Sequence, residues 1–295
     1  MRILNASGCL DALAAPEVAR ELDAFVTKTV TPLPREGSAP PRIAETAHGM
    51  LNAIGLANPG RDRFLAEHLP RLSQLGVPIW VSVGGFTAAD YAETCAVLRS
   101  DEVAAVELNL SCPNVDEAAD SAAEIVAACR RATPLPLYAK LSAAVPDVAA
   151  LARAVQKAGA DGLSLINTIR GLKLDEYTLR PVLGRITGGL SGPALKPVAL
   201  AAVYACHRAT RLPIVGMGGV QTGRDALELI AAGARHVALG TVLFADPDAP
   251  SRVRAELAAA ANDVGVVHPD ELFALAHAPF DSPQKDVESG RKLRA

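Results

Sequence analysis

The 295-residue sequence is poor in aromatic side chains, which make up 4% of its residues. It also lacks any block of lysine or arginine, and its 29 basic and 32 acidic residues give a formal charge of −3. A surface that binds nucleic acid or anionic lipid needs clustered basic residues to neutralise phosphates, and a pocket built on ring stacking needs aromatic residues. Both absences therefore argue for a small ligand that is held by other means.

The sequence has no apolar run of about 18 residues, so we predict no transmembrane helix. Asn5 and Asp11 interrupt the apolar N-terminus, which argues against a signal peptide. The cysteines form no C-x-x-C pair, and the histidines form neither an H-x-H nor an H-E-x-x-H pattern. This spacing indicates no disulfide framework, iron–sulfur cluster or metal site, and we expect a soluble cytoplasmic protein. The five cysteines are Cys9, Cys95, Cys112, Cys129 and Cys206.

Short, nearly continuous apolar segments alternate with longer amphipathic segments along the chain. Strands have this composition when helices cover both faces of a parallel sheet. Adding a short strand at 51–55 brings the count to eight, which predicts an α/β protein with a (β/α)8 TIM barrel. The predicted strands are 25–30, 51–55, 78–85, 103–111, 136–142, 162–168, 213–219 and 236–241. The predicted helices are 88–99, 117–131, 147–158, 196–208 and 222–232.

The barrel accounts for residues 1–278 as one domain, with an inserted excursion at 31–70 after the first strand and a polar tail at 279–295. A doubly wound sheet is the alternative architecture. Such sheets bind dinucleotides through a glycine fingerprint in the first β-α turn, but the glycine-rich segment here lies at 216–223. Gln221 stands where the last glycine of that fingerprint would be, and no Walker sequence occurs. We therefore favour the barrel.

Polar side chains recur where the predicted strands end. In a barrel the carboxyl ends of the strands meet at one face, and active sites lie there. A single asparagine at a strand end is most often a turn residue, but four amides and two lysines together indicate a planar ligand rich in hydrogen-bonding groups. This set contains Lys28, Thr29, Asn52, Asn109, Asn114, Lys140, Asn167 and Thr168.

Glycines follow the last predicted strands as Gly218 and Gly219, as Gly240 beside Thr241, and in the segment 188–193. Backbone N–H groups at glycine turns approach an anion closely, and barrels place phosphates in these loops. Tight turns that need a positive φ are the alternative reason for these glycines. A phosphate site beside a planar polar site predicts flavin mononucleotide (FMN) as the cofactor.

Cys112 is the one cysteine in a strand-end loop, where it stands between Asn109 and Asn114. A thiol has an ordinary pKa of about 8.5, and a nearby lysine such as Lys28 or Lys140 would lower it and provide a usable base. The other cysteines lie near the N-terminus or in predicted helices, where they act as small apolar residues. Cys112 is therefore our candidate catalytic residue.

Six segments of the sequence, among them ELNLSCPNV at 107–115, together resemble class 1 dihydroorotate dehydrogenase. The resemblance implies an FMN-binding barrel that oxidises (S)-dihydroorotate to orotate in the de novo synthesis of the pyrimidine nucleotide UMP. It also implies that Cys112 removes the proton from C5 while hydride leaves C6 for the flavin N5, with Lys28 as a second catalytic residue. The six segments are 26–37, 49–60, 107–115, 162–168, 188–193 and 216–219, and the likeness extends from about residue 5 to residue 244.

Two sets of binding residues follow from this resemblance. The substrate would contact Lys28, Asn52, Ile54, Gly55, Leu56, Asn109, Asn114, Asn167 and Thr168. The FMN would contact Ala6, Ser7, Gly8, Lys28, Thr29, Asn109, Lys140, Ile166, Gly192, Gly218, Gly219, Gly240 and Thr241. Lys140 would lie at the pyrimidine end of the flavin, where a lysine stabilises negative charge.

The sequence around Lys28 and Asn52 looks most like the catalytic subunit of class 1B. That subunit works with an electron-transfer subunit that carries FAD and a [2Fe-2S] cluster and passes electrons to NAD. This chain has neither a dinucleotide fingerprint nor a cysteine cluster, so such a route belongs to another polypeptide. Class 1A, which reduces fumarate directly, is the alternative. The resemblance implies a homodimer, or a heterotetramer with the partner subunit.

One segment departs from the family pattern. After CPNV at 112–115 the family usually continues through a stretch with glycine and phenylalanine, whereas here DEAADSAAE follows at 116–124. A shorter catalytic loop would cover the substrate less fully. This departure leaves open a divergent relative that acts on another dihydropyrimidine. Two alternatives are independent of the loop: a flavin-binding scaffold subunit with little activity, and a flavin enzyme for uracil in RNA, which the acidic balance disfavours.

Overall fold

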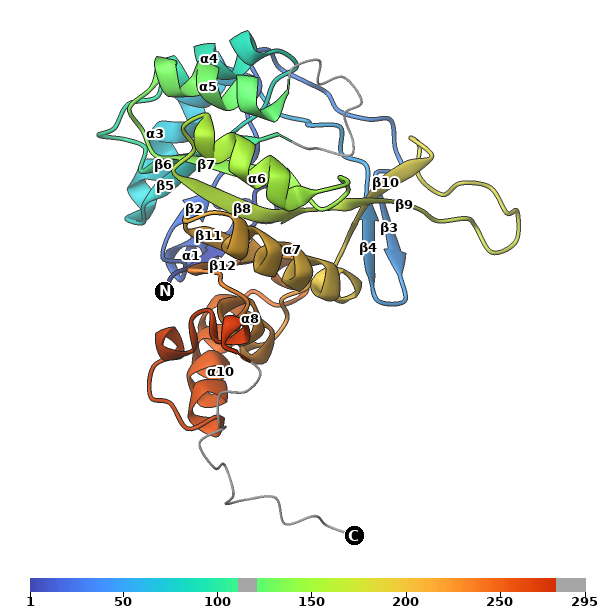
Figure 1. Cartoon of the computed structure of the whole chain (residues 1–295). Helices are drawn as coiled ribbons and strands as arrows, with labels where there is room; N and C mark the ends of the chain where they lie inside the picture. The colour runs from blue at the N-terminus through green and yellow to red at the C-terminus, as the bar shows by residue number, and fades with distance from the viewer. Residues whose placement is uncertain (111–120, 280–295) are drawn as a thin grey trace.

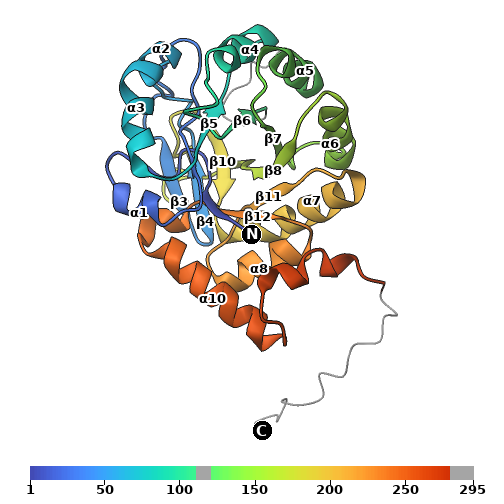
Figure 2. The ribbon, with the colours of Figure 1, turned by 90° about the vertical axis from the view of Figure 1, so that its left-hand side faces the viewer.

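The computed structural model describes residues 1–110 and 121–279. Eight parallel strands form the main sheet in the order β1-β12-β11-β8-β7-β6-β5-β2, and a parallel bridge between Leu4 and Ala24 joins the two ends of this order. The sheet therefore closes into a barrel, which confirms the predicted α/β architecture (Figure 1, Figure 2). The barrel strands are β1 (Ile3–Asn5), β2 (Phe25–Val26), β5 (Ile79–Val83), β6 (Ala105–Asn109), β7 (Leu137–Ser142), β8 (Gly162–Asn167), β11 (Ile214–Met217) and β12 (His236–Leu239).

Helices surround the barrel on its outer side (Figure 2). Thr87, Ser121 and Thr222 begin α4, α5 and α8 with capping boxes, in which the cap hydroxyl accepts from a backbone N–H that is otherwise without an acceptor. All five predicted helices are present, with bounds that differ by a few residues at their ends. The helices are α1 (Pro16–Arg20), α2 (Arg61–Arg63), α3 (Leu69–Leu72), α4 (Ala88–Ala96), α5 (Ala122–Ala132), α6 (Val148–Lys157), α7 (Lys196–Ala209), α8 (Gly223–Ala231), α9 (Val242–Ala245) and α10 (Ala249–Asp263).

Alternation along the strands divides the core into an outer and an inner part. Every second residue packs against the helices, as Val106 and Leu108 of β6 do. The residues between them face the barrel interior, which is apolar at the amino-terminal ends of the strands. There the rings of Trp80 and Tyr138 lie 4.3 Å apart, measured between centroids. Gly162 makes room for them, because a Cβ at this position would lie 2.3 Å from the Tyr138 ring.

The strand predicted at 51–55 is not a barrel strand, so its assignment was wrong. The chain forms a strand at Gly49–Asn52 instead, and this strand belongs to a separate antiparallel sheet. The eighth barrel strand is β1, which the sequence pattern does not predict. Three residues are too few to show a periodic pattern, and β1 is defined only by its distant partner, since Ile3 pairs with Val237 of β12.

The separate sheet stands beside the carboxyl ends of the barrel strands (Figure 1). Two of its strands come from the predicted excursion after the first predicted strand, and two come from the connection between β8 and α7. The excursion therefore supplies structure next to the site that the barrel rule predicts. The sheet contains β3 (Ile43–Thr46), β4 (Gly49–Asn52), β10 (Thr187–Ser191) and β9 (Ile169–Leu172), in this order.

Two further predictions from the sequence were a polar C-terminal tail and the absence of a transmembrane helix. The tail predicted at 279–295 lies outside the described residues, apart from position 279. Within residues 1–110 and 121–279, no helix has both the length and the apolar character needed to cross a membrane.

Candidate active site

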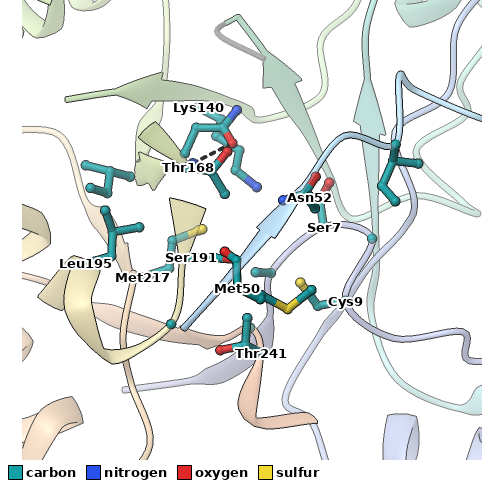
Figure 3. A pocket seen from close by; sticks show the side chains of 18 of the residues that line it. Ser7, Cys9, Met50, Asn52, Lys140, Thr168, Ser191, Leu195, Met217 and Thr241 are labelled. Atoms are coloured by element: carbon teal, nitrogen blue, oxygen red, sulfur yellow. Dashed lines mark hydrogen bonds between the residues drawn. The ribbon is translucent and has the colours of Figure 1, made fainter. Parts of the chain in front are cut away.

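A cavity of about 300 Å³ lies at the carboxyl ends of the barrel strands, with residues of the antiparallel sheet in its wall (Figure 3). Within the described part of the chain, every predicted site residue lines this cavity except Gly55. The barrel brings them together because the carboxyl ends of all its strands meet at one face. The predicted residues found here are Ala6, Ser7, Gly8, Lys28, Thr29, Asn52, Ile54, Leu56, Asn109, Lys140, Ile166, Asn167, Thr168, Gly192, Gly218, Gly219, Gly240 and Thr241.

Gly55 turns the chain between two residues that do line the cavity. Its φ is +73°, and a Cβ at this position would lie 2.5 Å from the backbone N and the Oγ of Ser38. Its carbonyl oxygen accepts a hydrogen bond of 3.3 Å from Nε of Arg35. Gly55 therefore shapes the wall from behind and allows Ile54 and Leu56 to reach the cavity.

Two predicted residues lie in the segment 111–120, outside the described residues. They are Cys112, the candidate base, and Asn114, a candidate substrate ligand. The structure describes the strand that leads to them, β6, which ends at Asn109 in the cavity wall.

The polar residues of the cavity wall form a continuous hydrogen-bond chain. Asn167 Nδ2 donates to Asn109 Oδ1 at 3.0 Å, and Asn109 Nδ2 donates to Thr29 Oγ1 at 3.1 Å. Below them, Ser82 Oγ lies 3.0 Å from Thr29 Oγ1 and 3.2 Å from Ser7 Oγ. Because Thr29, Ser82 and Asn109 are buried and Ser7 and Asn167 are half-buried, their mutual bonds offset the cost of removing them from water.

Two lysine head groups act on the same part of the cavity. Lys140 is 5% exposed, and its Nζ lies 3.4 Å from Oε1 of Glu107, which is 1% exposed. The Lys28 amine lies close to the backbone of Gly8: a Cβ added at Gly8 would be 3.1 Å from Lys28 Nζ. Burial raises the pKa of the Cys9 thiol, and the positive charges of Lys140 and Lys28 oppose that rise. The cavity is therefore suited to a ligand that carries or gains negative charge.

Three glycines at the cavity adopt backbone conformations that other residues disfavour. Gly192, Gly218 and Gly219 have φ values of +100°, +117° and +79°, a region that side chains disfavour. A Cβ at Gly219 would lie 2.8 Å from the backbone N of Lys196, so a side chain would collide with its neighbours. The positive φ values agree with the turn explanation, and the backbone of all three glycines borders the cavity, so the phosphate site stays a prediction.

The cavity also contains residues that the sequence pattern does not predict. Most of them are apolar, and although Met50, Ser191 and Met217 lie in segments that resemble the family, no local feature of the sequence marks them as site residues. Glu107, beneath the cavity, was missed as well, although a signal was present, because it is the one charge in the strand that ends at Asn109. Among the described residues, no group of three or more His, Cys, Asp and Glu side chains could hold a metal ion. The unpredicted lining residues are Cys9, Ile43, Met50, Ser191, Leu195, Met217, Val220 and Phe244.

Comparison with known sequences identifies the family of this barrel. A sequence model of the dihydroorotate dehydrogenase family matches residues 2–260. The chain belongs to this family. It is 45% identical over 284 residues to the dihydroorotate dehydrogenase B (NAD(+)) catalytic subunit of Geobacillus kaustophilus, covering 92% of this chain and 90% of that protein. It is also 45% identical over 260 residues to the subunit of the same name from Listeria monocytogenes, covering 85% and 86%.

Solved structures support the same barrel. The crystal structure of dihydroorotate dehydrogenase from Eimeria tenella in complex with ferulenol superposes with a TM-score of 0.79 at 24% identity, covering 94% of this chain and 85% of that one. The ligand-free structure from the same organism gives the same TM-score. The bacterial relatives in turn confirm the resemblance to class 1B that the sequence indicated.

Proposed function

We propose that this chain oxidises (S)-dihydroorotate to orotate with bound FMN, as the catalytic subunit of an NAD-linked dihydroorotate dehydrogenase. One observation carries the proposal: within the described part of the chain, all the site residues that the sequence predicts, apart from Gly55, converge on one cavity at the carboxyl ends of the barrel strands. The barrel brings strand-end residues to one face whatever their role, so the support lies in their chemistry: amides, hydroxyls and two lysines line one cavity, which suits a planar ligand with negative charge.

The described residues fit FMN in both charge and shape. Gly192, Gly218 and Gly219 all line the cavity with a positive φ, and their backbone without side chains suits the close approach of a phosphate. Lys140 would hold the pyrimidine end of the flavin ring, where negative charge develops. When bound, FMN supplies the hydride acceptor that no side chain can provide.

The remaining chemistry belongs to the side chains around the substrate. Cys112 would take the proton from C5 of dihydroorotate, and Lys28 would stabilise the negative charge of the substrate. Asn109 and Asn167 sit in a fixed hydrogen-bond chain, so they orient a flat ring at little further cost in conformational entropy. Asn52, whose amide donates to the carbonyl oxygen of Gly189 at 3.3 Å, would hold the opposite edge together with Asn114 and Thr168.

The same proposal includes NAD as the electron acceptor, reached through a partner subunit. The relatives are named NAD(+) enzymes and catalytic subunits, and this sequence has no dinucleotide fingerprint. We therefore assign FAD and a [2Fe-2S] cluster to a partner subunit, within a heterotetramer built on a homodimer of this chain. The connection between β9 and β10 exposes Tyr177 at 92% and Leu179 at 70%, and such apolar exposure is typical of subunit contacts.

An anaerobic titration of the purified chain with dihydroorotate tests the proposal. We expect loss of the yellow absorbance of the oxidised flavin, followed by its return when NAD and the partner subunit are supplied. A yellow protein that stays yellow would contradict the substrate and favour another dihydropyrimidine. A colourless protein that cannot be reconstituted with FMN would contradict the cofactor.

The glycine turns give a prediction for cofactor binding. Gly219→Ala should weaken FMN binding about tenfold or more, because the added Cβ would press on Lys196 and a positive φ is strained for alanine. Titration of apoprotein with FMN, followed by the quenching of flavin fluorescence, measures this. Gly76→Ala is the matched control, since Gly76 has a φ of +77° but no atom within 4 Å of its added Cβ. Equal affinity in the two variants would refute a role of the 219 turn in FMN binding.

A further inference from the structure

We propose that Glu107 is a positioning residue of this active site: it sets the charge beneath the flavin through Lys140 and orders Asn109 and Asn167 through Ser82. Glu107 does not line the cavity, so it acts only through these neighbours. The inference rests on the proposed function, because FMN and orotate are the ligands toward which these residues would act.

The burial of Glu107 is the first observation. Among the described residues, Glu107 and Lys140 are the only charged side chains that are buried. They belong to neighbouring strands inside the barrel, and the 3.4 Å contact joins Lys140 Nζ to Glu107 Oε1. A buried ion pair is weak evidence for stability, because removing both charges from water costs about as much as their attraction returns. Its place directly below a cavity-lining lysine therefore points to a role in the site.

The second observation is the direction of the hydrogen bonds. The Ser82 hydroxyl donates to Glu107 Oε1 at 3.3 Å, and an ionised carboxylate only accepts. Ser82 has a single hydroxyl hydrogen, which it gives to Glu107, so it accepts from Ser7 Oγ, and Thr29 is the donor in the 3.0 Å contact between Thr29 Oγ1 and Ser82 Oγ. Thr29 in turn accepts from the amide of Asn109.

The chain continues in the same direction to the top of the cavity wall. Asn109 accepts through its Oδ1 from Asn167 Nδ2, and Asn167 Oδ1 accepts from the backbone N–H of Thr168. Each of these bonds thus runs from the cavity wall down to Glu107. The Thr168 N–H, which only donates, and the Glu107 carboxylate, which only accepts, stand at the two ends, and together they favour one assignment of donors and acceptors for both asparagines, which a planar ligand then meets.

Two substitutions separate the two actions of Glu107. Glu107→Gln keeps the shape and one acceptor oxygen but removes the negative charge, so we expect the midpoint potential of the bound flavin to become more positive. Ser82→Ala cuts the chain and keeps the charge, so we expect orotate affinity to fall about fivefold to tenfold with an unchanged potential. Ser82 is buried and does not line the cavity, so this loss would be transmitted through Thr29.

The experiment uses the FMN-loaded full chain. Potentials are measured by equilibrium reduction with dithionite and a reference dye, and orotate binding is measured from the shift in the flavin spectrum. Ser164→Ala is the matched control: Ser164 of β8 stands opposite Lys140 in the β7–β8 register, is 1% exposed, and its buried Oγ has no hydrogen-bond partner, so alanine breaks no bond beside the lysine. Ser164→Ala should change neither the flavin potential nor the orotate affinity. If the effects came only from disturbing the packing of the barrel interior, the control would change both quantities as the two variants do.

The outcomes keep this inference separate from the proposed function. An unchanged potential in Glu107→Gln would overturn the charge role, and unchanged orotate binding in Ser82→Ala would overturn the ordering role. If Glu107→Gln does not fold, Ser82→Ala still decides the second role. The potential needs no substrate, so it tests Glu107 even if dihydroorotate fails to bleach the wild-type protein, which is the result that would refute the proposed function.

Discussion

Replacing Cys112 by alanine is expected to slow flavin reduction by dihydroorotate about 10²- to 10⁴-fold, the usual contribution of a general base. Orotate affinity should stay within about threefold of the wild-type value, because the thiol acts on the C5 proton and the amides and Lys28 hold the ring. Stopped-flow absorbance of the anaerobic FMN-loaded protein measures the rate, and the spectral shift on adding orotate measures the affinity.

Cys9 provides the control for this assignment. Cys9 lines the cavity, but burial raises the pKa of its thiol, which makes it a poor base near neutral pH. Cys9→Ala should therefore retain a rate within a fewfold of the wild-type value. The opposite pattern, with full rate in Cys112→Ala and a large loss in Cys9→Ala, would move the base from the strand-end loop to the N-terminal turn.

Replacing Lys140 by methionine is expected to have two effects, one on stability and one on FMN binding. The variant leaves Glu107 charged and buried without its partner, which should lower the free energy of unfolding by about 3–5 kcal/mol. It also removes the cation that we assign to the pyrimidine end of the flavin, so the protein should be purified largely colourless. Urea unfolding and the ratio of flavin to protein absorbance measure the two effects.

A double variant separates these effects. Lys140→Met combined with Glu107→Leu removes the uncompensated charge and should recover most of the stability, since an apolar pair can replace a buried ion pair. FMN binding should stay weak, because the cation is still absent. Full recovery of the flavin in the double variant would show that Lys140 serves the stability of the barrel and not the cofactor.

Much of the site can be predicted from the sequence because a barrel has a simple rule. The carboxyl ends of all strands meet at one face, so polar residues that follow apolar segments are brought together whatever the detailed packing. Lys28, Asn109, Lys140 and Asn167 are identified in this way, and each lines the cavity. Family resemblance adds residues that carry no local signal, such as Ala6 and Gly8.

The strands that were not predicted correctly from the sequence are those that form only by pairing with distant segments of the chain. β1 has three residues and is a strand because it pairs with β12, near the other end of the barrel sequence. β10 begins with threonine and two glycines, and glycine has low strand propensity, so this strand forms because β4 and β9 lie on either side of it. The apolar segment at 51–55 indicates a strand nearby, but only the tertiary structure decides which sheet that strand joins.

The sequence by itself determined the barrel, the family and most of the residues that face the cavity, because these depend on the order of apolar and polar segments along the chain. The tertiary structure alone decided what those residues contact. Glu107 meets Lys140 only because β6 and β7 pair in one register, with Asn109 opposite Lys140. A shift of one residue in either strand would turn one of the two charges outward, since side chains alternate between the faces of a strand.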